Sequence, residues 1–240
     1  MVLKSSVLER YIAGERDFSQ INLREIELIK VNLTQVDFTA ADLREARLGR
    51  ANLSFACLHK ANLSESILWG ADLTQANLAK ASLREADLSG AILTQANLEQ
   101  ANLVKAILEG VNFSGANLRN ALMIEVDLRP ALDYRTNLSY TDLSYADLSY
   151  ANLSMALLYR AKLDNAKFCR ANLSFGRGEN TLATDLTEVS LRGADLSYAN
   201  LTGAILHNAD LTGADLMGTV LTNAKLSGAI MPNGKIWQGQ

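Results

Sequence analysis

The chain has 240 residues, of which 48% are hydrophobic and 20% charged, and its formal net charge is −3. Because basic and acidic residues are mixed along it, the chain lacks the long-range field that attracts nucleic acid or an anionic membrane. No stretch reaches the roughly 18 apolar residues of a spanning helix, and the N-terminus lacks a signal-peptide core, so we expect a cytoplasmic protein without membrane contact.

A short helix is expected at residues 5–13, as the first element of the chain. Ser6 and Glu9 have the spacing of a capping box, and Gly14 is a helix-stop signal. Four apolar side chains would share one face of this helix: Val7, Leu8, Tyr11 and Ile12. We therefore assign residues 1–17 to an N-terminal α-helical cap.

A five-residue period follows, over residues 18–231. Leucine occupies almost every fifth position from Leu23 to Leu173 and again from Leu186 to Met231, with a small residue, usually alanine, two positions before it. Alternate residues of a strand point to one side, so this leucine and alanine should both face inward while the other three positions face solvent. One repeat therefore predicts one wall of a coil.

Matching residues also recur at a spacing of twenty, which is four repeats. One column contains Glu25, Glu45, Glu65 and Glu85, and another contains Thr34, Ser54, Thr74, Thr94, Ser114, Ser154 and Ser174. We therefore expect four-sided coils, about ten of them, stacked with neighbouring backbones hydrogen-bonded at roughly 4.8 Å.

The repeated motif Ala-(Asp/Asn)-Leu-x-x resembles the pentapeptide-repeat family, whose fold is a right-handed quadrilateral β-helix. Segments that depart from the motif, such as Ile67–Gly70, Asp127–Pro130 and Gly228–Gly234, are similar to those of family members that regulate heterocyst differentiation in cyanobacteria. The resemblance implies an all-β solenoid and a non-enzymatic positive regulator. It also implies a protein partner, the master transcription regulator of heterocyst differentiation, whose inhibitory peptide the chain would counter.

Two segments interrupt the period, at residues 129–136 and 176–184. In the first, Asp133 takes an inward position where a lone carboxylate is costly, so we expect that segment to bulge outward. In the second, the distance along the chain from Leu173 to Leu186 is not a multiple of five, and it leaves either three or eight residues beyond the repeat. Loops that interrupt a rigid scaffold are favoured places for function.

Residues 232–240 are expected to form a C-terminal tail or cap. Pro232, Asn233 and Gly234 make a turn signal. The turn would let Ile236 and Trp237 fold back over the last coil.

Outward tyrosines and arginines are the candidate partner-binding residues, because both types are enriched at interface hot spots. The set is Tyr134, Arg135, Tyr140, Tyr145, Tyr150, Tyr159 and Arg177. Three of the tyrosines belong to consecutive walls of one coil, so a single partner would contact at most two of them unless it wraps around the rod. The alternative is that tyrosine is a tolerated outer-corner residue, as Tyr198 suggests.

Two further features allow more than one interpretation. Trp69 is either an anchor for a partner or a ring that packs flat on neighbouring coils. The arginines and glutamates that recur every twenty residues are either an electrostatic docking strip or a solvated wall of alternating charges.

The sequence predicts no catalytic, cofactor-binding or metal site. Cys57 and His59 lack a second ligand pair for zinc, and the many serines have no base beside them. Cys57 and Cys169 should lie more than five coils apart, too far for a disulfide, so we expect free thiols.

We expect a monomeric scaffold without direct contact to nucleic acid. The alternative function is duplex mimicry that modulates a topoisomerase such as gyrase. A mimic needs phosphate-like charge density, which a net charge of −3 does not provide.

Overall fold

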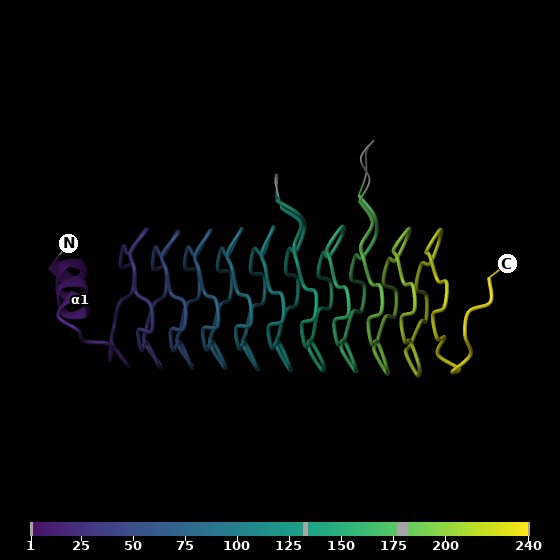
Figure 1. Ribbon diagram of the computed structural model, residues 1–240, viewed down its shortest axis with the longest axis horizontal. Coiled ribbons are helices and arrows are strands. Elements are labelled where there is room, and N and C mark those ends of the chain that lie inside the picture. The colour runs from purple at the N-terminus through teal and green to yellow at the C-terminus, as the bar shows by residue number, and fades with distance from the viewer. Residues whose placement is uncertain (1, 132–133, 177–181, 240) are drawn as a thin grey trace.

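The molecule is an elongated rod with a helix at one end and the C-terminal segment at the other (Figure 1). The computed structural model describes residues 2–131, 134–176 and 182–239, and only the backbone of residues 2–5. The helix, α1, spans Val2–Ile12 and is the single helix of the described residues. Within these residues no helix has the length and apolar character needed to cross a lipid bilayer.

The strands of the rod are reduced to single bridge residues, most of which pair in parallel with a residue twenty positions away. Asn52, for example, pairs with Asp72. The N–H of Leu53 donates to the Asp72 carbonyl at 2.7 Å, and the Asp72 N–H donates back to the Ala51 carbonyl at 3.0 Å. Each wall is therefore hydrogen-bonded to the coils before and after it, as the spacing of twenty predicts.

The bridges form four columns, which are the walls of the rod and are named A to D. Wall A contains Asn97, Asn117, Asp142 and Lys162; wall B contains Asn102, Leu122, Asp147 and Lys167; wall C contains Ile107, Asp127, Asn152 and Asn172; wall D contains Asn112, Asn137, Leu157 and Asp185. Each corner takes the names of the two walls that it joins, so corner B–C lies between walls B and C.

Leucine and alanine fill the inside of the walls, as the five-residue period predicts. Ala101 and Leu103 are fully buried, and so are the larger rings of Phe113 and Phe168, which replace leucine at two central positions. The small side chain beside each large one lets the coil stay narrow.

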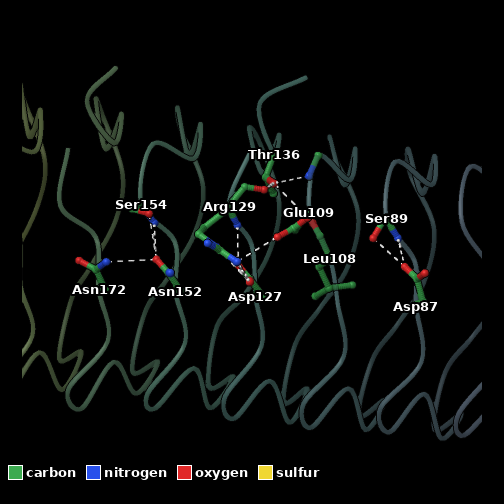
Figure 2. A network of polar contacts seen from close by, with 11 residues as sticks. Asp87, Ser89, Leu108, Glu109, Asp127, Arg129, Thr136, Asn152, Ser154 and Asn172 are labelled. Atoms are coloured by element: carbon green, nitrogen blue, oxygen red, sulfur yellow. Dashed lines mark hydrogen bonds and ion pairs between the residues drawn. The ribbon is translucent and has the colours of Figure 1, made fainter. Parts of the chain in front are cut away.

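The corners depend on residues with a left-handed backbone. Lys80 and Gln100, for example, have φ angles of 60° and 59°. This conformation costs an L-residue roughly 1–2 kcal/mol. The bridge residue stabilises the corner that follows, because Asp87 Oδ1 accepts hydrogen bonds from the Ser89 N–H at 2.9 Å and the Ser89 hydroxyl at 2.6 Å (Figure 2). The Asp or Asn of each repeat therefore has a structural role.

α1 covers the first coil, although it begins earlier than the sequence predicts. It starts at Val2, so Ser6 lies inside the helix and the capping-box interpretation is wrong. Val7 is buried, and the Tyr11 hydroxyl donates to the Thr34 carbonyl at 2.9 Å. Ile12 is 82% exposed and does not share the buried face, contrary to the prediction. Gly14, with a φ of 101°, follows the last turn as expected.

Two excursions leave the rod at the same corner, C–D (Figure 1). Excursion 1, residues 131–135, shifts the wall D pairing by five residues, so that Asn112 pairs with Asn137. The segment therefore bulges as predicted, although Asp133 itself lies outside the described residues. Excursion 2, residues 176–183, shifts the pairing of Leu157 to Asp185, so eight residues rather than three are extra.

The first of these shifts corrects one predicted column. Because Asn112 pairs with Asn137, Ser114 stacks on Ser139. Ser154 and Ser174 follow Asn152 and Asn172 on wall C, so they do not continue the column that begins at Thr34 on wall D. The five-residue phase survives the excursion, but the twenty-residue phase does not.

The C-terminal tail folds back as its turn signal predicts. Ile230 and Ile236 form an antiparallel bridge, and the Trp237 N–H donates to the Ala229 carbonyl at 2.7 Å. Ile236 and Trp237 nevertheless remain 62% and 43% exposed. The tail therefore pairs with one wall without burying these two side chains.

Truncating an inward leucine should destabilise the rod far more than truncating an outward apolar residue of the next wall. Leu103 is fully buried and Ile107 is 44% exposed. Leu103→Ala should lower the free energy of unfolding by about 2–5 kcal/mol through cavity formation, and Ile107→Ala by less than about 1 kcal/mol. Urea unfolding followed by circular dichroism measures the free energy of unfolding of both variants. Equal decreases in the two variants would contradict the assigned wall orientation.

Candidate functional site

The predicted tyrosines of one coil lie on three different corners. Tyr140 is at corner D–A, Tyr145 at corner A–B and Tyr150 at corner B–C. Their exposed fractions are 55%, 54% and 55%, so all three point outward as predicted. Because the corners face different directions, these residues do not form one patch.

Tyr159 forms a local cluster with Tyr140. The two rings meet edge to face, with centroids 5.5 Å apart, and the Arg160 guanidinium lies 5.1 Å from the Tyr159 ring centroid. Arg160 also pairs with Glu188 at 2.7 Å. The cluster belongs to wall D and corner D–A, and its contacts hold it within the rod surface.

Arg135 connects the two excursions. Its Nε donates to the Met155 carbonyl at 2.7 Å, and its Nη2 donates to the Ala183 carbonyl at 2.6 Å. Burial lowers the pKa of the Arg135 guanidinium, while the Asp185 carboxylate opposes that shift. Because these two guanidinium nitrogens bind carbonyls of its own chain, Arg135 ties excursion 1 to excursion 2. The neighbouring Tyr134 is 69% exposed, and Arg177 lies outside the described residues.

Both excursions close at their base with a buried threonine at the small inward position. The Thr136 hydroxyl donates to the Arg129 carbonyl at 2.9 Å and accepts from the Gly110 N–H at 3.0 Å (Figure 2). The Thr184 hydroxyl donates to the Ser174 carbonyl at 2.9 Å and accepts from the Met155 N–H at 2.9 Å. These equivalent contacts fix where each excursion leaves and rejoins the rod.

A groove of about 500 Å³ lies on wall C below the excursions and crosses four successive coils. Its lining residues are Arg129, Asn152, Ser154, Met155, Arg170, Ala171, Asn172, Ser174, Phe175, Gly176, Tyr198 and Asn200. We name it the wall C groove. Corner B–C forms one side of it and corner C–D the other.

Arg129, Asn152 and Asn172 form the floor of this groove, and polar contacts hold them in place (Figure 2). Arg129 pairs with Asp127 at 2.6 Å and Glu109 at 3.0 Å, and its bonds to Asp127 raise the pKa of the guanidinium. Asn172 donates to the Asn152 side chain at 3.1 Å. The floor is therefore polar and held by contacts between coils.

Aromatic rings border the groove on both sides. Tyr198 on corner B–C lies over Gly218, where a Cβ would come within 2.6 Å of the ring. Phe175 on corner C–D lies over Gly203 in the same way, at 2.4 Å. The Arg170 guanidinium is 5.7 Å from the Tyr198 ring centroid. Glycine in the next coil therefore lets each ring lie flat against the rod.

Sequence reasoning missed the grouping of Tyr150, Arg170 and Tyr198 along corner B–C. Arg170 follows Tyr150 at the regular spacing of one coil, but excursion 2 adds eight residues to the coil between Arg170 and Tyr198. From the sequence alone, Tyr198 indicates only that tyrosine is tolerated at an outer corner. The three residues can be assigned to one corner once excursion 2 is known to add eight residues.

Trp69 and the charged columns fit their structural interpretations. Trp69 lies over Gly49, with a Cβ there only 2.6 Å from the indole nitrogen, and the Arg50 guanidinium is 4.8 Å from the ring centroid. Arg24 pairs with Glu45 of the next coil. We therefore interpret the ring as packed and the charged column as a solvated, ion-paired surface.

The described residues contain no cluster of three or more His, Cys, Asp or Glu side chains arranged to hold a metal ion. Cys57 and Cys169 are free, as their predicted separation requires.

Comparison with known proteins places these features in a family. The family profile described as pentapeptide repeats matches the chain in eight copies, over residues 17–54, 56–95, 91–129, 136–174, 184–223 and 206–233. The matched ranges stop before each excursion and resume after it. No curated protein matches the sequence.

Comparison with solved structures also found similarities. The chain is similar to HetL, a pentapeptide repeat protein involved in heterocyst differentiation regulation from the cyanobacterium Nostoc sp. strain PCC 7120, with 54% identity, a TM-score of 0.96, and coverage of 97% of this chain and 98% of HetL. QnrB1, a plasmid-mediated fluoroquinolone resistance protein, is 16% identical over 85% of this chain and 91% of its own, with a TM-score of 0.31. Another Nostoc PCC 7120 pentapeptide repeat protein, alr5209, is 37% identical over 47% of this chain and 78% of its own, with a TM-score of 0.27.

Removing the Arg135 connection should loosen both excursions. Arg135→Met retains an apolar stem but leaves two carbonyls without their charged donor, so the free energy of unfolding should fall by about 1–3 kcal/mol. Amide hydrogen exchange should accelerate in both excursions, which leave the rod at corner C–D. Arg192→Met, which removes an exposed ion pair with Asp210 of 3.8 Å, is the control and should cost about 1 kcal/mol or less. Unchanged stability and exchange in Arg135→Met would refute the connecting role.

Proposed function

Because the chain belongs to the pentapeptide-repeat family, we propose that it is a non-enzymatic protein-interaction scaffold that promotes heterocyst differentiation. Its partner is the master transcription regulator of that process, and binding counters the regulator's inhibitory peptide. The full-length similarity to HetL carries this proposal.

A rigid rod acts on such a partner through binding energy alone. If the rod binds the peptide-free regulator more tightly than the peptide-bound form, it shifts the population toward the free form. Thermodynamic linkage makes this effect reciprocal, because the peptide must weaken rod binding by the same factor by which the rod weakens peptide binding. No chemical step is required of the rod.

The interface proposed for the regulator is the side of the rod that contains wall C. Both excursions leave from its corner C–D, where Tyr134 is exposed, and Tyr150 projects from its other corner, B–C. Tyr145 projects from corner A–B, which wall B separates from wall C. Of the tyrosines predicted to bind, Tyr134 and Tyr150 are therefore the proposed contacts, and Arg135 positions the excursions.

Duplex mimicry gains no support from the charge arrangement. Several acidic side chains pair with basic ones of a neighbouring coil, as in the pair of Arg129 with Glu109 at 3.0 Å and that of Lys105 with Glu125 at 3.9 Å. A DNA mimic needs a continuous surface of uncompensated negative charge. We therefore retain the scaffold as the single proposed function.

Binding of the purified regulator, measured by calorimetry, tests both the function and the interface. The wild-type rod should bind, and addition of the inhibitory peptide should weaken that binding. Tyr150→Ala should reduce the affinity about tenfold, as expected for an interface tyrosine. Tyr145→Ala is the matched control, with nearly the same exposure but a different corner, and should leave the affinity unchanged.

Absence of wild-type binding would refute the proposed partner. Wild-type binding with equal losses in Tyr150→Ala and Tyr145→Ala would retain the partner but refute the assigned side of the rod.

A further inference from the structure

The lining of the wall C groove shares part of its composition with protein interfaces. It contains arginine, tyrosine, phenylalanine and methionine together with Asn and Ser, and none of the described residues that line it is acidic or a lysine. Protein interfaces are enriched in the first four types and depleted of lysine, of both acidic types, and of serine and alanine. The lining matches this composition in its aromatic residues, methionine and arginine, but not in its serines or Ala171. The lining residues carry two positive charges, on Arg129 and Arg170, and no negative charge. The carboxylates of Asp127 and Glu109, which pair with Arg129, do not line the groove.

Among the described residues, Arg170 is the basic residue of the groove that has no acidic partner. Arg129 is neutralised by Asp127 and Glu109. Arg170 is exposed and lies near the Tyr198 ring, and it forms no ion pair with any residue that the structure describes. An exposed guanidinium without an ion-pair partner can donate hydrogen bonds in its plane to an incoming carboxylate.

Asn200 adds a second donor at the same end of the groove. Its Oδ1 accepts from the Thr202 N–H at 3.0 Å and from the Thr202 hydroxyl at 2.6 Å. Its Nδ2 has no acceptor within the described part of the chain. The lining therefore offers an acidic ligand both a charge and an amide donor.

We propose that the wall C groove binds a short acidic segment of the protein partner, with Arg170 receiving a carboxylate and Phe175 and Tyr198 packing against the segment. This inference rests on the proposed scaffold function and names the chemistry that its partner must present. The groove crosses four coils, a length of roughly 14 Å, which corresponds to about four extended residues. Charge complementarity and the aromatic borders together favour a peptide segment over a single ion.

Charge reversal at Arg170 tests the inference with a matched control. Arg50 also lies beside an aromatic ring, that of Trp69, and has no ion-pair partner among the described residues, but it is outside the groove. Arg170→Glu should weaken binding of the regulator about tenfold or more, and Arg50→Glu should change it less than about twofold. Raising the salt concentration should weaken wild-type binding more than that of Arg170→Gln, because one charge pair is absent from the variant.

A synthetic hexaglutamate peptide tests the groove independently of the regulator. Its addition should shift the NMR resonances of groove residues in the wild type, with no such shifts in Arg170→Glu or with a hexalysine peptide. Regulator binding that is equal in the wild type and Arg170→Glu would overturn the inference while leaving the scaffold function intact. Hexaglutamate shifts outside the groove, no shifts, or identical shifts with inorganic sulfate would also overturn it, whether or not the regulator binds.

Discussion

The structure depends on one constraint: every wall must hydrogen-bond to the walls above and below it, and this requires a coil to close after twenty residues. Residues beyond that number have no place in a wall, so they must leave at a corner. The chain does this twice at corner C–D, with five and then eight extra residues. Wall D resumes its pairing after each excursion, and the uniform rod thereby gains a side that differs from the other three.

The two excursions on that side are held by polar contacts in addition to the leucine packing of the walls. Thr136 and Thr184 occupy the position of a core alanine, yet their hydroxyls close the two necks. Arg135 then joins the excursions across the coil between them. Buried hydrogen bonds of this kind contribute modestly when made and cost more when one partner is lost, so they fix geometry more than they add stability. The described bases of the excursions are consequently fixed before a partner binds, which limits the entropy lost there on binding.

The sequence predicts the regular part of this rod well, because a period of five with inward leucine leaves few physical alternatives. It also indicates where the period fails. It could not predict how the walls continue after each failure: Ser154 keeps the five-residue phase of Ser114 but lies on another wall. Because of the same change in register, the sequence alone could not show that Tyr150, Arg170 and Tyr198 lie on one corner. The start of α1 was also missed, because the capping pattern at Ser6 lies within the helix rather than at its first residue.

Hydroxyl-radical footprinting of the rod, alone and bound to the regulator, tests most directly whether wall C and its two corners form the functional side. Tyr150, Met155, Phe175 and Tyr198 all carry side chains that such radicals oxidise, and all lie on that side. Binding should slow the oxidation of these four residues and leave the oxidation of Tyr145 unchanged. Protection of Tyr145 with undiminished oxidation of Phe175 and Tyr198 would contradict it.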